Sequence, residues 1–386
     1  MTSSKLRVAV LGAGAWAEHA HIPGWLRDPR CELVAICDVR AELARDFAQK
    51  FGVAESTDDW QALVGRPDID VIDVVTPSAT HFELSMAGLE AGKHVLCEKP
   101  LAPSVADAEA MVAAAERAGT VAACGFSYRR SPAISAIGEQ IAAGTLGELL
   151  QFNARYWCDY GADPQAPTSW RYTGAPGSGA LADLGSHLID LAEQLCGPIA
   201  TIQGATLPTL IKDRPVPLGV ALGHAGGVEL SDRREPVTND DVATFVADFT
   251  GGAVGTFSIS RVARGHGNDL MFEVFGTEAA ARMDLSRNSE FGFHDDGPSP
   301  VTNGWRRVVV GPEHPYIGPA QAMPFPGLGH GMQEYFTYQA RAFLDAVAGL
   351  ERLPAPATFA DGLRSLVVEQ AIVASAREGR SVPVAP

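Results

Sequence analysis

Three ionisable residues recur at helical spacing between Gly179 and Asp190. Asp183 and His187 are four residues apart and Asp190 follows three later, so all three would share one face of a helix. Histidine titrates near neutral pH and suits a general base that removes the proton of a hydroxyl group. The plainer alternative is a solvated helix face, on which an Asp–His pair contributes about 0.2–0.5 kcal/mol. The apolar stripe that would face the core is separate and consists of Leu181, Leu184, Leu188, Leu191 and Leu195.

A lysine that could stabilise a developing negative charge stands in the tripeptide Glu98-Lys99-Pro100. The tripeptide directly follows the apolar run His94–Cys97, which is typical of a buried strand. In an open parallel sheet the carboxyl ends of the strands line the ligand crevice, which argues against an ordinary surface lysine. We expect Lys99 to donate a hydrogen bond to an alkoxide, and Glu98 to hold backbone or ribose groups rather than to react.

A dinucleotide fingerprint, Gly12-x-Gly14-x-x-Ala17, follows the first apolar run, Leu6–Leu11. Gly12 permits the tight turn, Gly14 lets a pyrophosphate approach the backbone, and Ala17 keeps the helix close to the strand. The N-terminus of that helix then presents unsatisfied N–H groups to the phosphates. The residues of this turn that we expect to contact the cofactor are Gly12, Gly14, Ala15 and Trp16.

The second apolar run, Glu32–Cys37, ends at Asp38, about where a ribose-binding acid is expected. A carboxylate there accepts hydrogen bonds from the ribose hydroxyls and repels a 2′-phosphate, which favours NAD over NADP. Two alternatives stay open. Asp38 could be a turn residue, and Arg40 is close enough to receive a 2′-phosphate.

A set of motifs spread along essentially the whole chain resembles the Gfo/Idh/MocA family of oxidoreductases. These motifs are the fingerprint, the strand end Thr76-Pro77, His81, Glu98-Lys99-Pro100 and the segment Gly179–Asp190. The resemblance implies hydride transfer between NAD(P) and a sugar, cyclitol or related polyol. The catalytic residues that it implies are Lys99, Asp183 and His187, and the cofactor contacts that it adds are Thr76, Pro77, His81, Glu98, Lys99, Trp170 and Arg171.

Further segments resemble the members of that family that oxidise anhydrosugars such as levoglucosan or the 3-hydroxyl of glucopyranosides. There are three such segments: Phe126–Arg130, the run that starts with Ala162–Pro164 and ends with Ser169–Arg171, and Gly311–Tyr316. Aromatic side chains stack on pyranose faces, so a sugar site lined by aromatic and polar residues is expected. Beside Lys99, Asp183 and His187, the candidates for it are Tyr128, Arg155, Trp157 and Tyr160, for each of which a core or surface position is an equal alternative.

The order of the expected elements predicts an α/β protein of two domains. As far as residue 126, short valine-rich runs alternate with helical segments such as Ala41–Phe51, which predicts a doubly wound parallel Rossmann sheet. After a helix at Ser178–Cys196, successive strand-like runs from Ala243 to Leu285 lack intervening helices, which predicts an open, mostly antiparallel sheet. We expect domains at 1–127 and 128–386, with the final helices, Gln333–Ala348 and Ala360–Glu378, able to pack back on the first. The two Pro- and Gly-rich stretches Thr206–Asp240 and Asp295–Gly331 are expected to be long loops.

The amino-acid composition limits the classes of partner and the cellular compartment that we expect. The 386 residues include 30 basic and 46 acidic side chains, a net charge of −16, which argues against nucleic acid and anionic membranes as partners. No membrane span or signal peptide is apparent, and the six cysteines form no CxxC pair, so we expect buried thiols in a reducing cytoplasm. The scattered histidines predict no metal site. An open sheet face needs cover, so a homodimer or homotetramer is expected.

Two further functions compete with an NAD-dependent sugar dehydrogenase. The first is a redox-neutral lyase or glycosidase on the same fold, in which bound NAD oxidises and then re-reduces the sugar. The second is a regulator that senses a sugar or a dinucleotide, although intact Lys99, Asp183 and His187 count against it.

Overall fold

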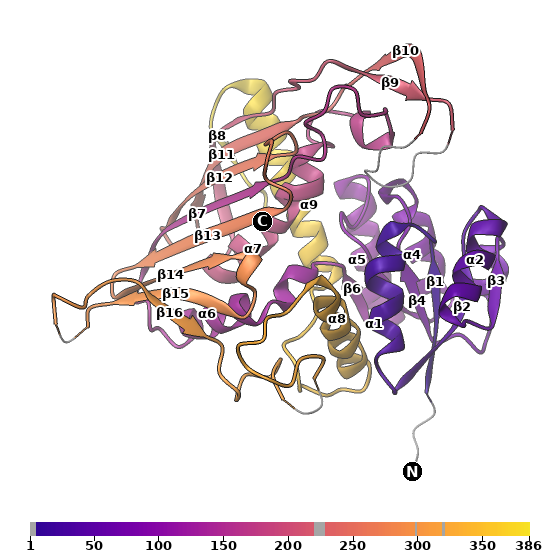
Figure 1. Cartoon of the computed structure of the whole chain (residues 1–386), viewed down its shortest axis with the longest axis horizontal. Helices are drawn as coiled ribbons and strands as arrows, with labels where there is room; N and C mark the ends of the chain where they lie inside the picture. Colours follow the sequence, from indigo (N-terminus) through magenta and orange to yellow (C-terminus); the bar gives the residue numbers. More distant parts are fainter. Residues whose placement is uncertain (1–4, 220–227, 298, 319–320) are drawn as a thin grey trace. The chain divides into compact units, whose positions relative to one another are not determined.

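The computed structural model describes residues 5–219, 228–297, 299–318 and 321–386, and the chain forms two compact units. The first unit comprises the chain as far as Arg130 together with Pro312–Phe325 and His330–Leu366. The second comprises Ser131–Gly311, Pro326–Gly329 and Val367–Pro386. The chain is traced through both in Figure 1.

The first unit contains a six-stranded sheet in which every pair of neighbours is parallel. In spatial order the strands are β3 (Glu55–Thr57), β2 (Cys31–Cys37), β1 (Leu6–Leu11), β4 (Val71–Val74), β5 (His94–Cys97) and β6 (Ala122–Cys124). The strand order reverses between β1 and β4, which is where doubly wound sheets bind ligands at the carboxyl ends of their strands. The predicted Rossmann sheet is confirmed.

Both faces of this sheet are covered, as its uniformly apolar strands require. Alternate residues of β1 enter different cores, with Val8 and Val10 in one and Ala9 and Leu11 in the other. The helices of the unit are α1 (Ile22–Leu26), α2 (Ala41–Phe51), α3 (Trp60–Val64), α4 (His81–Glu90), α5 (Val105–Ala118) and α8 (Met332–Val347). Although α8 lies far along the chain, it packs against α1 within this unit.

The second unit is built on a nine-stranded sheet whose strands lie side by side in Figure 1. In spatial order they are β16 (Arg306–Val309), β15 (Glu290–Asp295), β14 (Ala279–Asp284), β13 (Asp269–Gly276), β7 (Leu149–Trp157), β12 (Val254–Ser260), β11 (Val242–Phe249), β8 (Ile199–Thr206) and β17 (Val382–Pro383). Only the β7–β12 pair is parallel, so the prediction of a mostly antiparallel sheet is confirmed. Helices α6 (Pro132–Ala142) and α7 (Ser186–Cys196) pack against one another and against this sheet. The last helix, α9, runs from Phe359 to Glu378.

The structure corrects two expectations about local elements. The stretches predicted to be long loops contain strands, namely the antiparallel ribbon of β9 (Asp213–Pro217) with β10 (Leu230–Pro236), and β16 at the edge of the large sheet. Prolines are tolerated in such edge and ribbon strands because their missing N–H can face away from the partner strand. The helix expected from Ser178 begins instead with a π-helical turn, Leu181–Gly185, which leads directly into α7.

Candidate active site

The fingerprint turn has the backbone that a bound dinucleotide requires. Gly12 has a φ of +106°. A Cβ there would lie 2.6 Å from the carbonyl oxygen of Val75, the residue that directly follows the neighbouring strand β4. A Cβ at Gly14 would meet no atom of the described protein within 4 Å, so internal packing does not demand glycine there. The space beside Gly14 therefore suits a phosphate group at the helix N-terminus.

Asp38 ties the end of β2 to this turn. Its carboxylate accepts hydrogen bonds from the backbone N–H of Ala13 at 2.9 Å and from the backbone N–H and Nε of Arg40 at 3.0 Å each. Burial alone would raise the pKa of Asp38, but the bonds from Arg40 and Ala13 outweigh it and hold that pKa below its usual value. The group is an ionised acceptor, and the Arg40 guanidinium is paired with it.

His81 links the two strand ends that the sequence singled out. Its Nε2 lies 2.8 Å from the carbonyl oxygen of Thr76, and its Nδ1 lies 2.8 Å from that of Pro100. Burial lowers the pKa of this histidine. The histidine is only 1% exposed, so it is an internal link between the segment after β4, at Thr76, and the segment after β5, at Pro100. The Lys99–Pro100 peptide bond is cis.

In the second unit, Asp183 lies in the π-helical turn and His187 lies one turn later in α7. The hydroxyl of Tyr160 donates a hydrogen bond to Oδ2 of Asp183 at 2.6 Å. Burial, and then the nearby Asp183 charge, raise the pKa of Tyr160, so the phenol keeps its proton and Asp183 remains the acceptor. The His187 ring lies 6.2 Å from the ring of Tyr156, and both side chains are buried. Asp190, expected on the same polar face, is also buried.

Arg155 and Trp157 do not join this group. They alternate along β7 with Tyr156 and therefore point to the opposite face of the sheet from His187. There the Arg155 guanidinium lies over the Trp157 ring at 4.5 Å and bonds to Asp269 at 3.0 Å, while the Trp157 Nε1–H donates to Ser258. Of the four sugar-site candidates, Tyr160 bonds to the expected catalytic residue Asp183 in the second unit, and Tyr128 is buried in the first unit against Tyr335.

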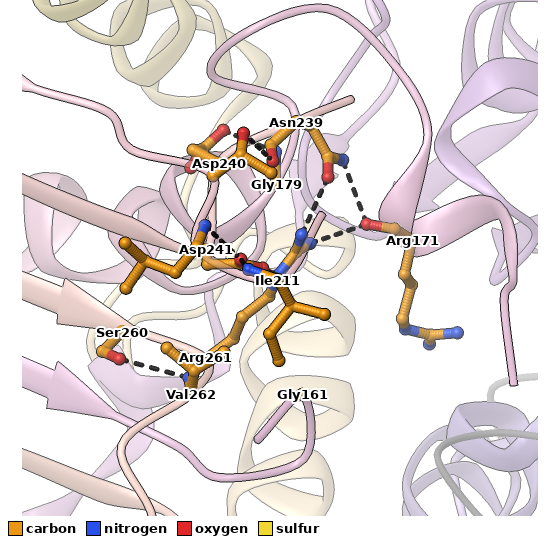
Figure 2. A network of polar contacts seen from close by, with 12 residues as sticks. Gly161, Arg171, Gly179, Ile211, Asn239, Asp240, Asp241, Ser260, Arg261 and Val262 are labelled. Carbon is orange, nitrogen blue, oxygen red and sulfur yellow. Dashed lines mark hydrogen bonds and ion pairs between the residues drawn. The ribbon is translucent and has the colours of Figure 1, made fainter. Parts of the chain in front are cut away.

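A buried polar network in the second unit anchors Arg171, as Figure 2 shows. The Arg171 carbonyl accepts from Nδ2 of Asn239 at 3.0 Å and from Arg261 at 2.7 Å. Arg261 in turn donates to Asp241 at 2.8 Å and to the Asn239 side-chain oxygen at 2.9 Å. The Arg171 side chain points away from the network and lies over the Trp170 ring at 4.4 Å. This segment is therefore held by its backbone, and its side chains are left for other contacts.

Sequence reasoning missed Asp240, which fixes the start of the helix that carries Asp183. Its carboxylate accepts from the backbone N–H groups of Gly177, Gly179 and Leu181 at 2.8–3.0 Å. Three consecutive polar residues, beginning at Asn239 and standing directly before an apolar strand, were the available signal. Among the residues that the structure describes, no group of three or more metal-ligating side chains gathers, and no helix is long and apolar enough to cross a membrane.

Comparisons with known proteins identify the family of this chain. A family model described as an oxidoreductase family with an NAD-binding Rossmann fold matches residues 6–126, and the GFO/IDH/MocA C-terminal domain matches residues 134–282. The chain is 37% identical to the levoglucosan dehydrogenase of Pseudarthrobacter phenanthrenivorans over 352 residues, which cover 90% of this chain and 88% of that enzyme. The chain belongs to the Gfo/Idh/MocA family. The resemblance that the motifs indicated is thereby confirmed, and the protein is an NAD-dependent oxidoreductase of a family that includes sugar dehydrogenases.

Two further comparisons show the range of the similarity. The D-glucoside 3-dehydrogenase of Escherichia coli is 37% identical over 199 residues, covering 51% of this chain and 56% of that enzyme. A solved structure of levoglucosan dehydrogenase in complex with NADH and levoglucosan superposes with a TM-score of 0.89 at 32% identity, covering 99% of this chain and 100% of that one. The fingerprint turn and Asp38 fit a dinucleotide, and the residues that would hold it are Gly12, Gly14, Ala15, Trp16, Asp38, Thr76 and Pro77.

The position of Asp38 predicts how this family member chooses between cofactors. The wild-type protein should bind NADH more tightly than NADPH, because the ionised carboxylate repels a 2′-phosphate. Asp38→Ala should reduce that preference by about tenfold or more, since it removes the carboxylate and releases Arg40 to meet a phosphate; a tenfold change corresponds to about 1.4 kcal/mol. Fluorescence titrations with both nucleotides measure the two affinities. Asp46→Ala, on the exposed side of α2, is the matched control, and tighter NADPH binding by the wild type would contradict the assignment.

Proposed function

We propose that this protein oxidises a secondary hydroxyl, the one at C3, of a pyranoside or of an anhydrosugar such as levoglucosan, and transfers the hydride to NAD. The observation that carries the proposal is the Asp183–Tyr160 pair with His187 one helical turn away. It occurs in a chain that is 37% identical to a levoglucosan dehydrogenase over 88% of that enzyme's length.

The chemistry divides among three side chains. NAD, when bound, supplies the nicotinamide that accepts hydride from the carbon. His187 removes the hydroxyl proton, and the Lys99 ammonium donates a hydrogen bond to the oxygen as negative charge develops on it. Asp183, held by the Tyr160 hydroxyl, orients the substrate or His187. Trp170 and Arg171 contact the cofactor or the sugar, and the Asn239–Arg261 network anchors the backbone carbonyl of Arg171.

A panel of substrates tests the proposal directly. Purified protein is incubated with NAD and with levoglucosan, methyl glucosides, free pyranoses or inositols, and NADH is followed by its absorbance. Levoglucosan or a glucopyranoside should give the highest kcat/KM, and the oxidised product should carry its ketone at C3. If an inositol gave the highest kcat/KM, the substrate would instead be a cyclitol. Consumption of sugar without net NADH would instead indicate a redox-neutral lyase or glycosidase, and binding without turnover would indicate a sensor.

We also propose that the protein is a homodimer or homotetramer of the cytoplasm. All six cysteines are free thiols, as a reducing compartment favours. The face of the nine-stranded sheet that points away from α7 carries Val246 and Val254 on the adjacent strands β11 and β12, 37% and 41% exposed. A flat sheet face with exposed apolar residues is suited to association with a second copy.

Light scattering at micromolar concentration should therefore report a dimer or a tetramer. Val254→Arg should shift the protein toward the monomer, because it places a charge within the proposed interface. Val301→Arg is the control, since Val301 is 93% exposed and lies outside the sheet. A monomeric wild-type protein would refute the assembly and leave the proposed reaction untouched.

A further inference from the structure

The buried side chain of His21 links two neighbouring strands of the Rossmann sheet. His21 is the last residue of the π-helical turn Ala17–His21, which follows the fingerprint. The Nδ1 of His21 lies 2.9 Å from a carboxylate oxygen of Asp73 on β4, and its Nε2 lies 3.0 Å from Oε1 of Glu98, directly after β5. The three residues are 2%, 0% and 6% exposed. Trp25 completes the cluster, because its Nε1–H donates to Asp73 at 2.7 Å. His21, Asp73 and Glu98 together form a buried clamp between β4 and the end of β5.

The chemistry of the partners sets the charge of the ring. An ionised carboxylate can only accept hydrogen bonds, so an imidazole between two of them must donate from both nitrogens and carry a positive charge. Burial lowers the pKa of His21, but the Coulombic attraction and hydrogen bonds of Asp73 and Glu98 outweigh it and raise that pKa to about 10. The other ring packed against His21, Phe336 at 4.8 Å, is apolar. The histidine is therefore an imidazolium throughout the neutral range.

The second oxygen of Glu98 connects this clamp to Lys99. Its Oε2 accepts the backbone N–H of Lys99 at 3.0 Å, while Oε1 is held by His21. The carboxylate fits only because residue 125 is glycine, since a Cβ at Gly125 would lie 2.6 Å from Oε1. On the far side of Lys99, the carbonyl of Pro100 contacts His81 at 2.8 Å. The backbone on either side of Lys99 is thus held by partly buried hydrogen bonds.

We propose that His21 is a positioning residue for Lys99, because as a charged N–H donor clamped between Asp73 and Glu98 it fixes the carboxylate that holds the Lys99 backbone. The inference rests on the proposed function in so far as Lys99 acts on the substrate there. Without a charged donor opposite Oε1, Glu98 and Asp73 would face one another in a buried space with no cation between them, and Asp73 would keep only the Trp25 N–H as a donor. One of the two would then take up a proton, and Glu98 could no longer hold Lys99 in a single position.

The kinetic test uses a pair of variants in the full-length protein. His21→Gln should lower kcat by about 10- to 100-fold, because a shift of about 1 Å in a catalytic group can cost about 10²-fold. It should change the NADH affinity by less than about threefold, and its kcat should gain a new rise with pH as Glu98 ionises. The double variant H21Q/D73N offers amide donors to Glu98 without the second carboxylate, so it should recover most of the lost kcat and lose the new pH dependence.

Three further measurements separate the outcomes. His94→Gln is the matched control, because His94 is a half-buried histidine at the opposite end of β5, where its Nδ1 accepts the Val121 N–H. Proton NMR of the protein without substrate should show low-field N–H resonances of the His21–carboxylate pairs that vanish in His21→Gln and persist in Lys99→Ala. Thermal unfolding identifies a variant that fails to fold, and the double variant then decides. Wild-type kcat and pH profile in His21→Gln, or no recovery in a folded double variant, would overturn the positioning role. An inactive wild-type protein that shows the resonances would refute the proposed function instead.

Discussion

Replacing Lys99 with alanine should lower kcat for sugar oxidation by about 10²–10⁴-fold. The ammonium stabilises charge that appears on the oxygen only as hydride leaves, so its loss affects the transition state more than the ground state. The fingerprint turn and Asp38 remain intact in this variant, and NAD affinity should stay close to that of the wild type. Stopped-flow hydride transfer and fluorescence titration measure the two quantities separately.

The pH dependence of the Lys99→Ala variant adds a second criterion. Raising the pH should not restore its turnover, because hydroxide does not replace a lost positive charge. Lys50→Ala is a suitable control, since Lys50 is an exposed lysine of the same unit that pairs with Glu18. If Lys99→Ala kept a kcat within a few-fold of the wild type, Lys99 would have no part in the mechanism. Other groups would then have to explain the sugar specificity.

Replacing His187 with alanine should also lower kcat by about 10²–10⁴-fold at neutral pH, because the variant lacks the base for the hydroxyl proton. Here the deficit should shrink as the pH rises, since hydroxide can take over proton removal. The opposite responses of the Lys99 and His187 variants to pH therefore distinguish charge stabilisation from proton transfer. The measurement is single-turnover hydride transfer across a range of pH with saturating NAD.

The control for His187 is another histidine of the second unit. His266 bonds to Asp269 and lies beside the Trp157 ring, on the face of the sheet that points away from His187. His266→Ala should therefore keep its activity and an unchanged pH profile. If His187→Ala kept near-normal turnover at neutral pH, the base would be neutral Lys99, or Asp183 acting through a water molecule.

The Rossmann half of the protein could be predicted from the sequence because its signals are local. Short apolar runs such as Leu6–Leu11 are long enough to identify a strand covered on both faces, and Gly12 follows at a turn where a positive φ is needed. Likewise, the spacing of Asp183 and His187 on one helix requires only helical periodicity. Motif order along the chain was sufficient to indicate the family, which the comparisons confirm.

What the sequence left open depends on pairings between distant residues. The face on which Arg155 and Trp157 lie follows from the register of β7 with β12 and β13, whose partners are about a hundred residues away along the chain. The Asp240 carboxylate reaches the start of the Asp183 helix from 59 to 63 residues away, and the polar run around Asp240 does not indicate which backbone groups it will contact.

The His21 clamp is the clearest example of a contact that depends on residues far apart in the sequence. In the sequence, His21 is one of the scattered histidines that predicted no metal site, and Asp73 lies within an apolar run where a carboxylate has no evident purpose. The parallel pairing of β4 with β5 brings Asp73 and Glu98 into neighbouring strands, and the turn after β1 places the imidazole between them. The sequence alone thus determined the cofactor-binding fold and the types of the reactive side chains, because short-range periodicity and turn geometry specify them. The tertiary structure decided which buried charges hold those side chains in place, because a buried ion needs partners that only the folded chain brings within hydrogen-bonding distance.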